Sequence, residues 1–397
     1  MRLLHIADLH LGKRIGEFRL LAEQAALLTW VVDTAIEQQV QGILLAGDIY
    51  DRSVPPVEAV ALFDHFLTRL HAAHIPLFAI SGNHDSPERI AFGSELFEES
   101  DIYLSPVYDG QIRTIPLETD TERVYIHLLP FLKPIHVRLA LGLDASEDTE
   151  GEVNGDIEDS HALSYTDAMA AVLSRLTLPK DGCNILVCHQ FITGSVRSDS
   201  EEVPLVGTLD AIDAALFADF DYVALGHLHR SQTVAGQENI RYAGTLMPYA
   251  FSETDEKGCI LLDTTDGLHT SFLPVPAGLT RTLATIEGTY DDLIRLDYRE
   301  SCPHRDDYLR ILLDEDTPVP DAMAKLSTVY PHVVQLQYKG QSTVITADDA
   351  SVPAGEVLTP DKVFAAFFAR QNDTTLTDDD YNYICKLLGE EEEPCGH

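Results

Sequence analysis

The sequence is poor in basic residues, and it has no long apolar segment. Only 27 of its 397 residues are Lys or Arg, against 65 Asp or Glu, which gives a formal net charge of −38. A chain with this charge repels nucleic acid and anionic membranes unless a local site or a partner protein offsets it. A solvated acidic surface, such as an adaptation to salt, is the simplest account of the excess.

Patterned cysteine is also missing. The six cysteines form no C-x-x-C pair, which argues against a structural zinc site and favours reduced thiols in a cytosol. Arg2, His5, Asp8 and His10 fall within the first ten residues, so we expect no signal peptide. No apolar run approaches the ~20 residues that span a bilayer. These absences together predict a cytoplasmic protein.

Apolar runs typical of buried strands alternate with amphipathic patterns over the first hundred residues. The expected strands are 3–7, 42–46 and 75–81, and the expected helices are 19–39, 55–73 and 87–99. Further strands are expected at 111–117, 123–129, 184–188, 222–225, 241–245 and 259–263, with a helix at 164–176 and loops at 144–160 and 191–207. This order predicts an α/β fold in which two sheets form a β-sandwich flanked by helices.

The composition changes after the Pro- and Gly-rich stretch 274–278, which suggests three parts: 1–276, 280–340 and 341–397. The middle part has strand patterns at 281–286, 308–313 and 333–338 and a helical pattern at 321–330, so we expect a small α/β domain. The last part begins as a polar linker and carries short amphipathic segments at 360–370 and 377–388. Two Phe- and Tyr-containing amphipathic segments suit a groove on a partner protein, or they pack back on their own domain.

Polar side chains follow several of the expected strands at the point where each strand ends. They are Asp8, His10, Asp48, Asn83, His189, His227 and His229. In α/β sheets ligands bind at the carboxyl ends of strands, so these groups can converge at one sheet edge. Apart from His84, the remaining histidines, His5 among them, are expected to be ordinary core or surface residues.

Two carboxylates, one amide and four imidazoles are too many ligands for one tetrahedral zinc ion. They suit two divalent ions about 3.5–4 Å apart with one bridging carboxylate. Oxygen and imidazole donors favour manganese, iron or zinc over calcium. The two ions outweigh the two carboxylates, so the pocket attracts an anion although the whole chain is acidic.

This charge balance predicts phosphoryl chemistry. A metal-bound water loses a proton near neutral pH and becomes a nucleophile, and the ions stabilise the negative charge of an in-line displacement. His84 can protonate the departing oxygen or orient the phosphate. Asp51 is placed to hold His84, Arg52 to reach a phosphate oxygen, and Asp85 to support the ligands from behind.

At these residues the chain resembles the calcineurin-like metallophosphoesterase superfamily. The resemblance runs through Asp8-x-His10, Gly47-Asp48-x-x-Asp51-Arg52, Gly82-Asn83-His84-Asp85, His189 and Gly226-His227-x-His229. It extends to Tyr242-Ala243-Gly244-Thr245 and Phe251-Ser252-Glu253, as in the nuclease subunits of bacterial DNA-repair complexes. It covers about 1–275 by motif and 280–397 by layout.

The resemblance implies a role for each residue. One manganese would take Asp8, His10, Asp48 and His229, and the other Asp48, Asn83, His189 and His227, with Asp48 bridging. His84 would be the catalytic histidine. Many relatives carry a histidine where Asp51 stands. The implied reaction is a 3′-to-5′ exonuclease on duplex ends and an endonuclease on single strands and hairpins, acting in DNA repair, recombination and replication.

The resemblance also implies partners and a location. A homodimer would form through the helices at 55–73 and 87–99, although core packing also accounts for most of their apolar residues. The domain at 280–340 would be a cap that directs DNA. The segments after 341 would bind an ATPase subunit, in a heterotetramer that associates with the nucleoid. A basic DNA-binding surface on that ATPase would offset the acidity of this chain.

Two other functions fit parts of the sequence. A phosphatase or small-molecule phosphodiesterase would share the two-metal core but would not need the residues after 276. A non-catalytic scaffold would use the tail for assembly. Loss of a metal ligand would have pointed to a scaffold, and no ligand is missing.

Overall fold

The structure, a computed structural model, describes residues 1–120, 122–142, 163–198, 201, 211–315 and 317–339, and positions 368, 376, 377, 380 and 381. The chain divides into two units, Met1–Gln341 and Ser342–His397. The predicted loop at 144–160 lies outside the described residues, as do the predicted segments at 360–370 and 377–388 apart from those isolated positions. Among the helices so described, none is long and apolar enough to cross a membrane.

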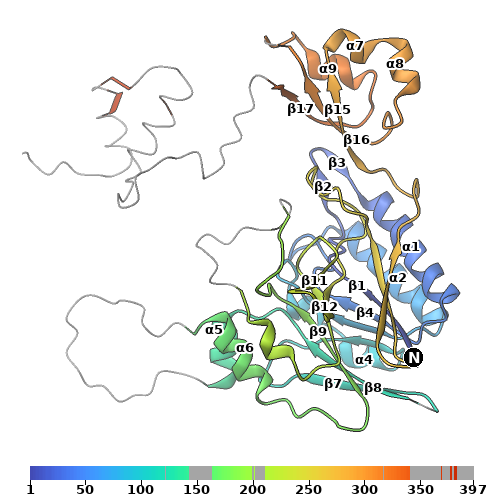
Figure 1. Cartoon of the computed structure of the whole chain (residues 1–397), viewed down its shortest axis with the longest axis vertical. Coiled ribbons are helices and arrows are strands. Elements are labelled where there is room, and N and C mark those ends of the chain that lie inside the picture. Colours follow the sequence, from blue (N-terminus) through green and yellow to red (C-terminus); the bar gives the residue numbers. More distant parts are fainter. Residues whose placement is uncertain are drawn as a thin grey trace, which may run out of the picture. The chain divides into compact units, whose positions relative to one another are not determined.

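Two six-stranded sheets form the body of the first unit (Figure 1). The first sheet has the order β14 (His269–Pro274), β13 (Gly258–Asp263), β1 (Arg2–Ile6), β4 (Ile43–Ala46), β5 (Leu77–Ile80), β6 (Ile102–Leu104). The second has the order β11 (Gln232–Val234), β12 (Gln237–Tyr242), β10 (Tyr222–Gly226), β9 (Cys183–His189), β8 (Arg123–Leu129), β7 (Arg113–Glu118). Each sheet contains a run of four parallel strands, β1-β4-β5-β6 and β12-β10-β9-β8. The carboxyl ends of each run therefore lie at one edge of its sheet.

The two sheets face each other across a buried apolar layer. Its members come from strands of both sheets and include Leu3, Leu44, Phe78, Ile126, Ile185 and Tyr222. The predicted two-sheet sandwich is confirmed by this layer. Strands that carry apolar residues on both faces are typical of sheets covered on both sides.

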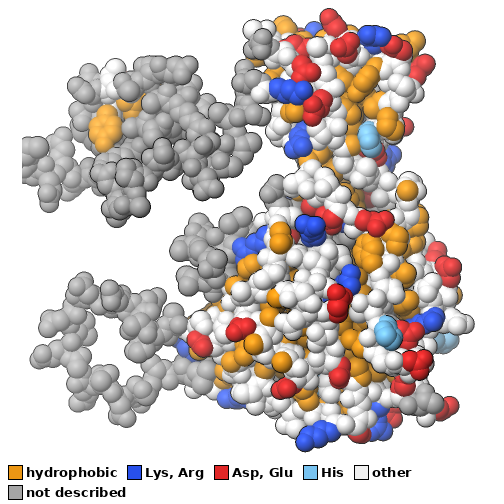
Figure 2. Space-filling model, viewed as in Figure 1, with side chains coloured by type: hydrophobic (Ala, Val, Ile, Leu, Met, Phe, Trp, Pro, Cys, Tyr) orange, Lys and Arg blue, Asp and Glu red, His pale blue; other side chains and the backbone are white. Residues whose placement is uncertain are grey.

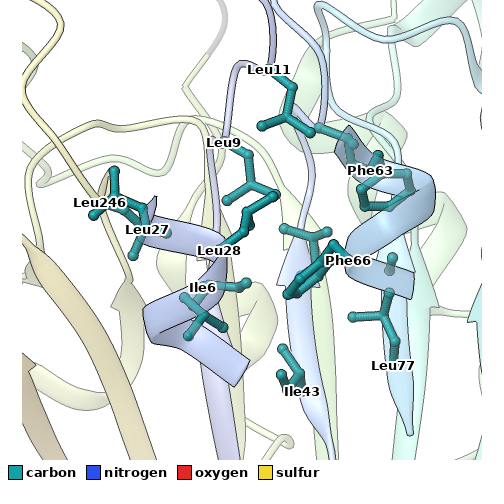
Figure 3. Close-up of a cluster of buried hydrophobic side chains, with 14 of the residues drawn as sticks. Ile6, Leu9, Leu11, Leu27, Leu28, Ile43, Phe63, Phe66, Leu77 and Leu246 are labelled. Carbon is teal, nitrogen blue, oxygen red and sulfur yellow. The ribbon is translucent and has the colours of Figure 1, made fainter. Parts of the chain in front are cut away.

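Helices cover the outer faces of the sandwich. α1 (Leu21–Glu37) and α2 (Val57–Ala72) pack on the first sheet through the cluster in Figure 3, where Leu28 and Phe66 lie against Ile6, Ile43 and Leu77. α5 (Pro134–Leu141), α6 (Tyr165–Leu173) and the 3₁₀ helix η1 (Ala214–Phe217) pack on the second sheet. This packing fixes the strands whose ends carry the polar residues.

Two sequence predictions need correction. The single helix expected at 87–99 is two short helices, α3 (Pro87–Ile90) and α4 (Ser94–Glu98), because Gly93 adopts a left-handed conformation (φ 73°) between them. The strand expected at 241–245 ends at Tyr242, since Gly244 is also left-handed (φ 75°) and turns the chain.

The predicted small α/β domain contains a three-stranded parallel sheet, β15 (Leu283–Gly288), β16 (Tyr308–Leu313) and β17 (Val333–Tyr338). Its helices are α7 (Tyr290–Ile294), α8 (Leu296–Ser301) and α9 (Ala322–Ser327), and it has its own core. It contacts the hairpin of β2 (Arg14–Ile15) and β3 (Phe18–Arg19), where the ring of Phe18 meets that of Tyr308 at 5.6 Å between centroids. Arg281 also donates a 2.7 Å hydrogen bond to buried Glu23.

Acidic side chains are scattered over the face of the molecule shown in Figure 2 and do not gather into one patch. This distribution is what a solvated acidic surface requires, because dispersed charges repel one another less than clustered charges do.

His5 lies between the two sheets, where its imidazole is completely buried. Its Nδ1 is 3.1 Å from the Tyr222 hydroxyl and its Nε2 is 3.1 Å from the Leu225 carbonyl, so it links β1 to β10. Burial lowers the pKa of His5 to about 3 and outweighs the opposing hydrogen bond to Leu225. His5 is therefore a structural residue that stays neutral in the folded chain.

This burial makes stability depend on pH. Between pH 4 and 6 the unfolded chain binds a proton at His5 and the folded chain does not, so His5 makes the free energy of unfolding rise with pH by about 1.4 kcal/mol per unit. We expect a His5→Gln variant to show a shallower rise in denaturant titrations across this range. Equal slopes for the two proteins would contradict the assignment.

Candidate metal centre

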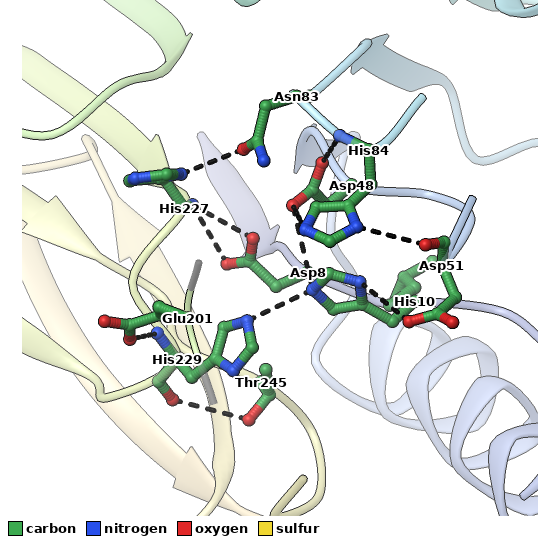
Figure 4. A network of polar contacts seen from close by, with 12 residues as sticks. Asp8, His10, Asp48, Asp51, Asn83, His84, Glu201, His227, His229 and Thr245 are labelled. Atoms are coloured by element: carbon green, nitrogen blue, oxygen red, sulfur yellow. Dashed lines mark hydrogen bonds and ion pairs between the residues drawn. The ribbon is translucent and has the colours of Figure 1, made fainter. Parts of the chain in front are cut away.

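The seven predicted ligands converge where the carboxyl ends of strands from both sheets meet, and Figure 4 labels all of them except His189. Asp8 and His10 follow β1, Asp48 follows β4 and Asn83 follows β5, while His189 closes β9 and His227 and His229 follow β10. Three overlapping groups have ligand atoms within 4.8 Å of one another: Asp8-His10-His229, His10-Asp48-His84 and Asp8-Asp48-His189. Positions more than two hundred residues apart in the chain thus share one centre.

Four of these residues hold an uncommon backbone conformation. Asp8, His10, Asp48 and His227 all have positive φ, at 54°, 42°, 48° and 100°. Such conformations cost of order 1–3 kcal/mol each in non-glycine residues and persist where surrounding structure enforces them. Here the strained turns point the side chains of the strand ends into the shared centre.

Glycines leave the space that the ligands occupy. A Cβ on Gly82 would lie 2.1 Å from Asp48 Oδ1, and one on Gly47 would lie 2.3 Å from His189 Nδ1. Gly47 also has φ +84°, which other residues rarely adopt. Any other residue at position 47 or 82 would therefore displace His189 or Asp48 from its place in the centre.

One side of the centre contains two imidazole nitrogens that face each other. His10 Nε2 and His229 Nε2 are 3.1 Å apart, and Asp48 Oδ2 lies 3.7 Å from His10 Nε2. Asp8 completes this group, and its carboxylate accepts the His227 backbone N–H at 2.9 Å. Two imidazole nitrogens this close together can both bind one metal ion.

The other side brings two imidazole nitrogens together with a carboxylate oxygen and an amide oxygen. His189 Nδ1 donates to the Ala46 carbonyl at 2.8 Å, which leaves Nε2 with a lone pair in the neutral ring. That Nε2 lies 3.0 Å from Asn83 Oδ1 and 3.4 Å from Asp48 Oδ2, and His227 Nδ1 lies 2.9 Å from the same amide oxygen. A cation satisfies such a set of acceptors, so the residues present fit a pair of divalent metal ions.

Ionisation in the centre agrees with this fit. Burial lowers the pKa of His10 well below its ordinary value and that of His227 to about 3, which keeps both rings neutral as metal binding requires. Burial raises the pKa of Asp8 to about 7. Burial alone would lower the pKa of His189, but the nearby Asp48 carboxylate raises that pKa to about 9. Burial alone would raise the pKa of Asp48, but His189 holds that pKa far below its usual range. Without metal, a His189 proton neutralises Asp48.

His84 stands beside this centre and remains partly open to solvent. Its Nδ1 donates to the backbone carbonyl of Asp51 at 3.0 Å, and its Nε2 lies 3.9 Å from Asp48 Oδ2. The predicted hold of Asp51 on His84 thus comes from the main chain. The Asp51 carboxylate pairs with Lys13 at 2.7 Å instead. Arg52 is exposed, with its Nε 3.7 Å from Asp51.

Asp85 supports the ligand loops from behind, as the sequence predicted. Its buried carboxylate accepts the backbone N–H groups of Ile49, Tyr50 and Gly82 at 2.9–3.0 Å. Burial raises its pKa to about 6, a rise that these three hydrogen bonds oppose. Asp85 thus ties the loop after β4 to the loop after β5.

Other buried polar residues around the centre were not predicted from the sequence. Glu201 accepts the His229 backbone N–H at 2.7 Å, and Lys257 donates to the His229 carbonyl at 3.0 Å and pairs with Glu253 at 2.6 Å. Gln24 on α1 donates to the carbonyls of Leu9 and His10. None of these residues ends an apolar strand, so the pattern that revealed the ligands could not reveal their supports.

Comparisons with known proteins agree with this geometry. The calcineurin-like phosphoesterase family matches residues 1–231, and a domain described as the type 5 capsule protein repressor C-terminal domain matches residues 279–372. The D subunit of nuclease SbcCD from Staphylococcus epidermidis is 32% identical over 342 residues, 85% of each chain. The protein of the same name from Staphylococcus saprophyticus is 31% identical over 341 residues, 85% of this chain and 84% of the relative.

A solved dimetal phosphatase from Danio rerio aligns with 68% of this chain at 13% identity and a TM-score of 0.38. That likeness is too weak to support an argument. The family assignment comes from the sequence matches alone.

Proposed function

Because the chain belongs to the calcineurin-like phosphoesterases, and among them to the SbcD family, we propose that it is the DNA nuclease subunit of an SbcCD-type complex. It hydrolyses phosphodiester bonds by two-metal catalysis. In this role it acts as a 3′-to-5′ exonuclease on duplex ends and as an endonuclease on single strands and hairpins, together with an SbcC-type ATPase, in DNA repair, recombination and replication.

One observation carries the catalytic part of this proposal. Side chains from five separate strand ends meet at one centre, where His10 Nε2 lies 3.1 Å from His229 Nε2, and Asn83 Oδ1 lies 3.0 Å from His189 Nε2 and 2.9 Å from His227 Nδ1. Sites of this composition suit two divalent ions, and Asp48, which lies near both His10 and His189, would help to hold both of them. We propose manganese for the site, because it is one of the ions that these oxygen and imidazole donors suit and the one that the family resemblance implies.

Each residue then has a defined task. When bound, the two ions supply Lewis-acid charge and a nucleophile derived from water. Asp48 holds the two halves of the centre together, and its Oδ1 fixes the His84 backbone through a 2.9 Å hydrogen bond. His84, oriented by the Asp51 carbonyl, presents Nε2 to the departing oxygen and delivers a proton there. Arg52 reaches outward from Asp51 toward the substrate phosphate.

The test is cleavage of labelled DNA duplexes and hairpins with manganese, with and without the ATPase subunit. We expect EDTA to abolish cleavage and added Mn²⁺ to restore it. If DNA stays intact with the ATPase present while a simple phosphate ester is hydrolysed, the two-metal assignment survives and the nuclease assignment is wrong.

The three predicted parts of the chain have distinct tasks in this proposal. Residues 1–276 carry the chemistry, 280–340 form a cap that directs DNA, and 341–397 bind the SbcC-type subunit. The cap is supported by its own core and by its contacts with the β2-β3 hairpin, next to the loop that carries Lys13. A basic DNA-binding surface on the partner would offset the charge of −38.

A homodimer is supported by apolar side chains that the fold leaves uncovered. Some apolar residues of α2, α3 and α4 pack in the core, namely Phe63, Phe66, Leu67 and Ile90. Others on these helices or in the turn between α3 and α4 are exposed, namely Val57, Val60, Phe92, Leu96 and Phe97. Phe92 is 82% and Leu96 76% exposed. Large exposed apolar side chains suit a protein interface.

We expect the double substitution Phe92→Glu and Leu96→Glu to convert a dimer into a monomer, because buried charges oppose association. Sedimentation equilibrium measures the change. Leu139→Glu on α5 is the matched control, since Leu139 is 65% exposed on the opposite side of the sandwich. A mass equal to that of the unmodified protein would place the interface elsewhere.

A further inference from the structure

Arg197 pairs with no acidic side chain among the residues that the structure describes, although the chain is rich in acid. It follows β9 in the loop that leaves His189, and it is half-buried. Its guanidinium carbon lies 3.8 Å from the centre of the Phe191 ring. Within the described part of the chain it forms no ion pair and its buried Nε has no hydrogen-bond partner, whereas Arg113 and Arg123 both pair with carboxylates.

The backbone on both sides of Arg197 is fixed. Gln232 binds Val196 twice, accepting its N–H at 2.9 Å and donating to its carbonyl at 2.8 Å. On the other side, the Ser198 N–H donates to Glu201 at 2.9 Å, and the same Glu201 carboxylate accepts the His229 N–H. Arg197 is thus held between two anchors: Gln232 follows His229 in the chain, and Glu201 accepts the His229 backbone N–H.

Arg197 packs next to one of the strand ends that form the centre. The Phe191 ring on which it stacks lies two residues after His189, the last residue of β9. Stacking on Phe191 orders the side chain before any ligand binds, so less conformational entropy is lost on binding. The planar guanidinium offers a fork of donors that matches the oxygens of a phosphate.

We propose that Arg197 is a positioning residue that binds a backbone phosphate of the nucleic acid strand beside the metal centre. The proposal rests on the nuclease function proposed above and adds the residue that places the strand. In an acidic protein such a contact gives the strand one fixed attachment next to the reacting bond. The role of Glu201 and Gln232 is then to set the position of Arg197 relative to His229.

The test compares Arg197→Ala and Arg197→Lys with the unmodified protein, each in complex with the ATPase subunit. Arg175→Ala is the control for charge, because Arg175 is exposed at the end of α6 on the outer face of the second sheet. Binding of labelled DNA is measured by fluorescence anisotropy in EDTA, where no turnover occurs. KM and kcat are measured with manganese for DNA and for bis(4-nitrophenyl) phosphate.

We expect Arg197→Ala to weaken DNA binding and raise KM for DNA about tenfold or more, with little change in kcat. The slope of log affinity against log salt should fall by about one, and Arg197→Lys should recover part of the loss. A raised KM for DNA alone identifies a phosphate next to the scissile one, and a raised KM for both substrates identifies the scissile phosphate. DNA binding and KM values equal to those of Arg175→Ala would overturn the proposal.

The same variants separate this proposal from the nuclease assignment. If the unmodified complex neither binds nor cleaves DNA, the nuclease function fails. Inhibition of small-ester hydrolysis by inorganic phosphate then tests Arg197 directly. An inhibition constant raised about tenfold in Arg197→Ala supports phosphate binding, and an unchanged constant rejects it.

Discussion

An Asp48→Asn variant is expected to lose DNA cleavage by about 10³-fold or more. A catalytic metal ion contributes several kcal/mol, and each 1.36 kcal/mol is a factor of ten in rate. Asparagine has nearly the same shape and can still accept the His84 N–H through its amide oxygen, so the fold should survive. It lacks the negative charge that both groups of ligands need. The measurements are the cleavage rate and the metal content after gel filtration.

The matched control is His84→Gln, because His84 is adjacent to Asp48 but has no predicted ligand role. We expect this variant to keep both metals and its thermal stability while its cleavage rate falls by about 10²–10⁴-fold. Loss of metal in His84→Gln would make His84 a ligand. Full metal content in Asp48→Asn would remove Asp48 from the bridging position.

A Gly226→Ala variant is expected to lose about 3 kcal/mol or more of folding stability together with most of its metal affinity. The added Cβ would lie 1.8 Å from the Ala46 carbonyl oxygen and 2.8 Å from His189 Nδ1. That carbonyl accepts the hydrogen bond that orients His189. Because β10 and β4 belong to different sheets, the clash forces the two sheets apart at the metal centre.

Gly267→Ala separates this clash from the general effect of replacing glycine. Gly267 has φ +100°, and an added Cβ there would meet no atom within 4 Å, so its substitution carries backbone strain without a collision. We expect it to cost about 1–2 kcal/mol and to leave metal content unchanged. Thermal unfolding of the metal-free proteins and metal analysis after reconstitution compare the two. Similar losses in both variants would show that crowding at Gly226 is relieved easily.

The meeting of the seven predicted ligand side chains could be predicted from the sequence because each stands at or just after the end of an apolar strand. Asp8, Asp48 and His189 all carry that local signal. The same reasoning could not find Glu201 or Lys257, since their partners lie elsewhere in the chain and only folding brings them together. The sequence also could not show which group of Asp51 holds His84, and in the structure the backbone carbonyl does so, not the side-chain carboxylate.

Boundaries were harder to predict than the order of elements. The apolar spacing of 87–99 is helical throughout, and nothing in that spacing reveals the left-handed turn at Gly93. The apolar residues that the sequence offered for an interface on α2 divide between the core and the solvent for a similar reason. One helix presents Phe63 to the core and Val57 to solvent, and the sequence marks both only as apolar.

The centre draws Asp8, His10, Asp48 and Asn83 from the first sheet and His189, His227 and His229 from the second. Bound ions therefore act as a removable cross-link between the two halves of the sandwich. A ligand at 100 times its dissociation constant adds about 2.7 kcal/mol to stability. The supply of metal in the cell would then set the lifetime of this protein as well as its rate of turnover.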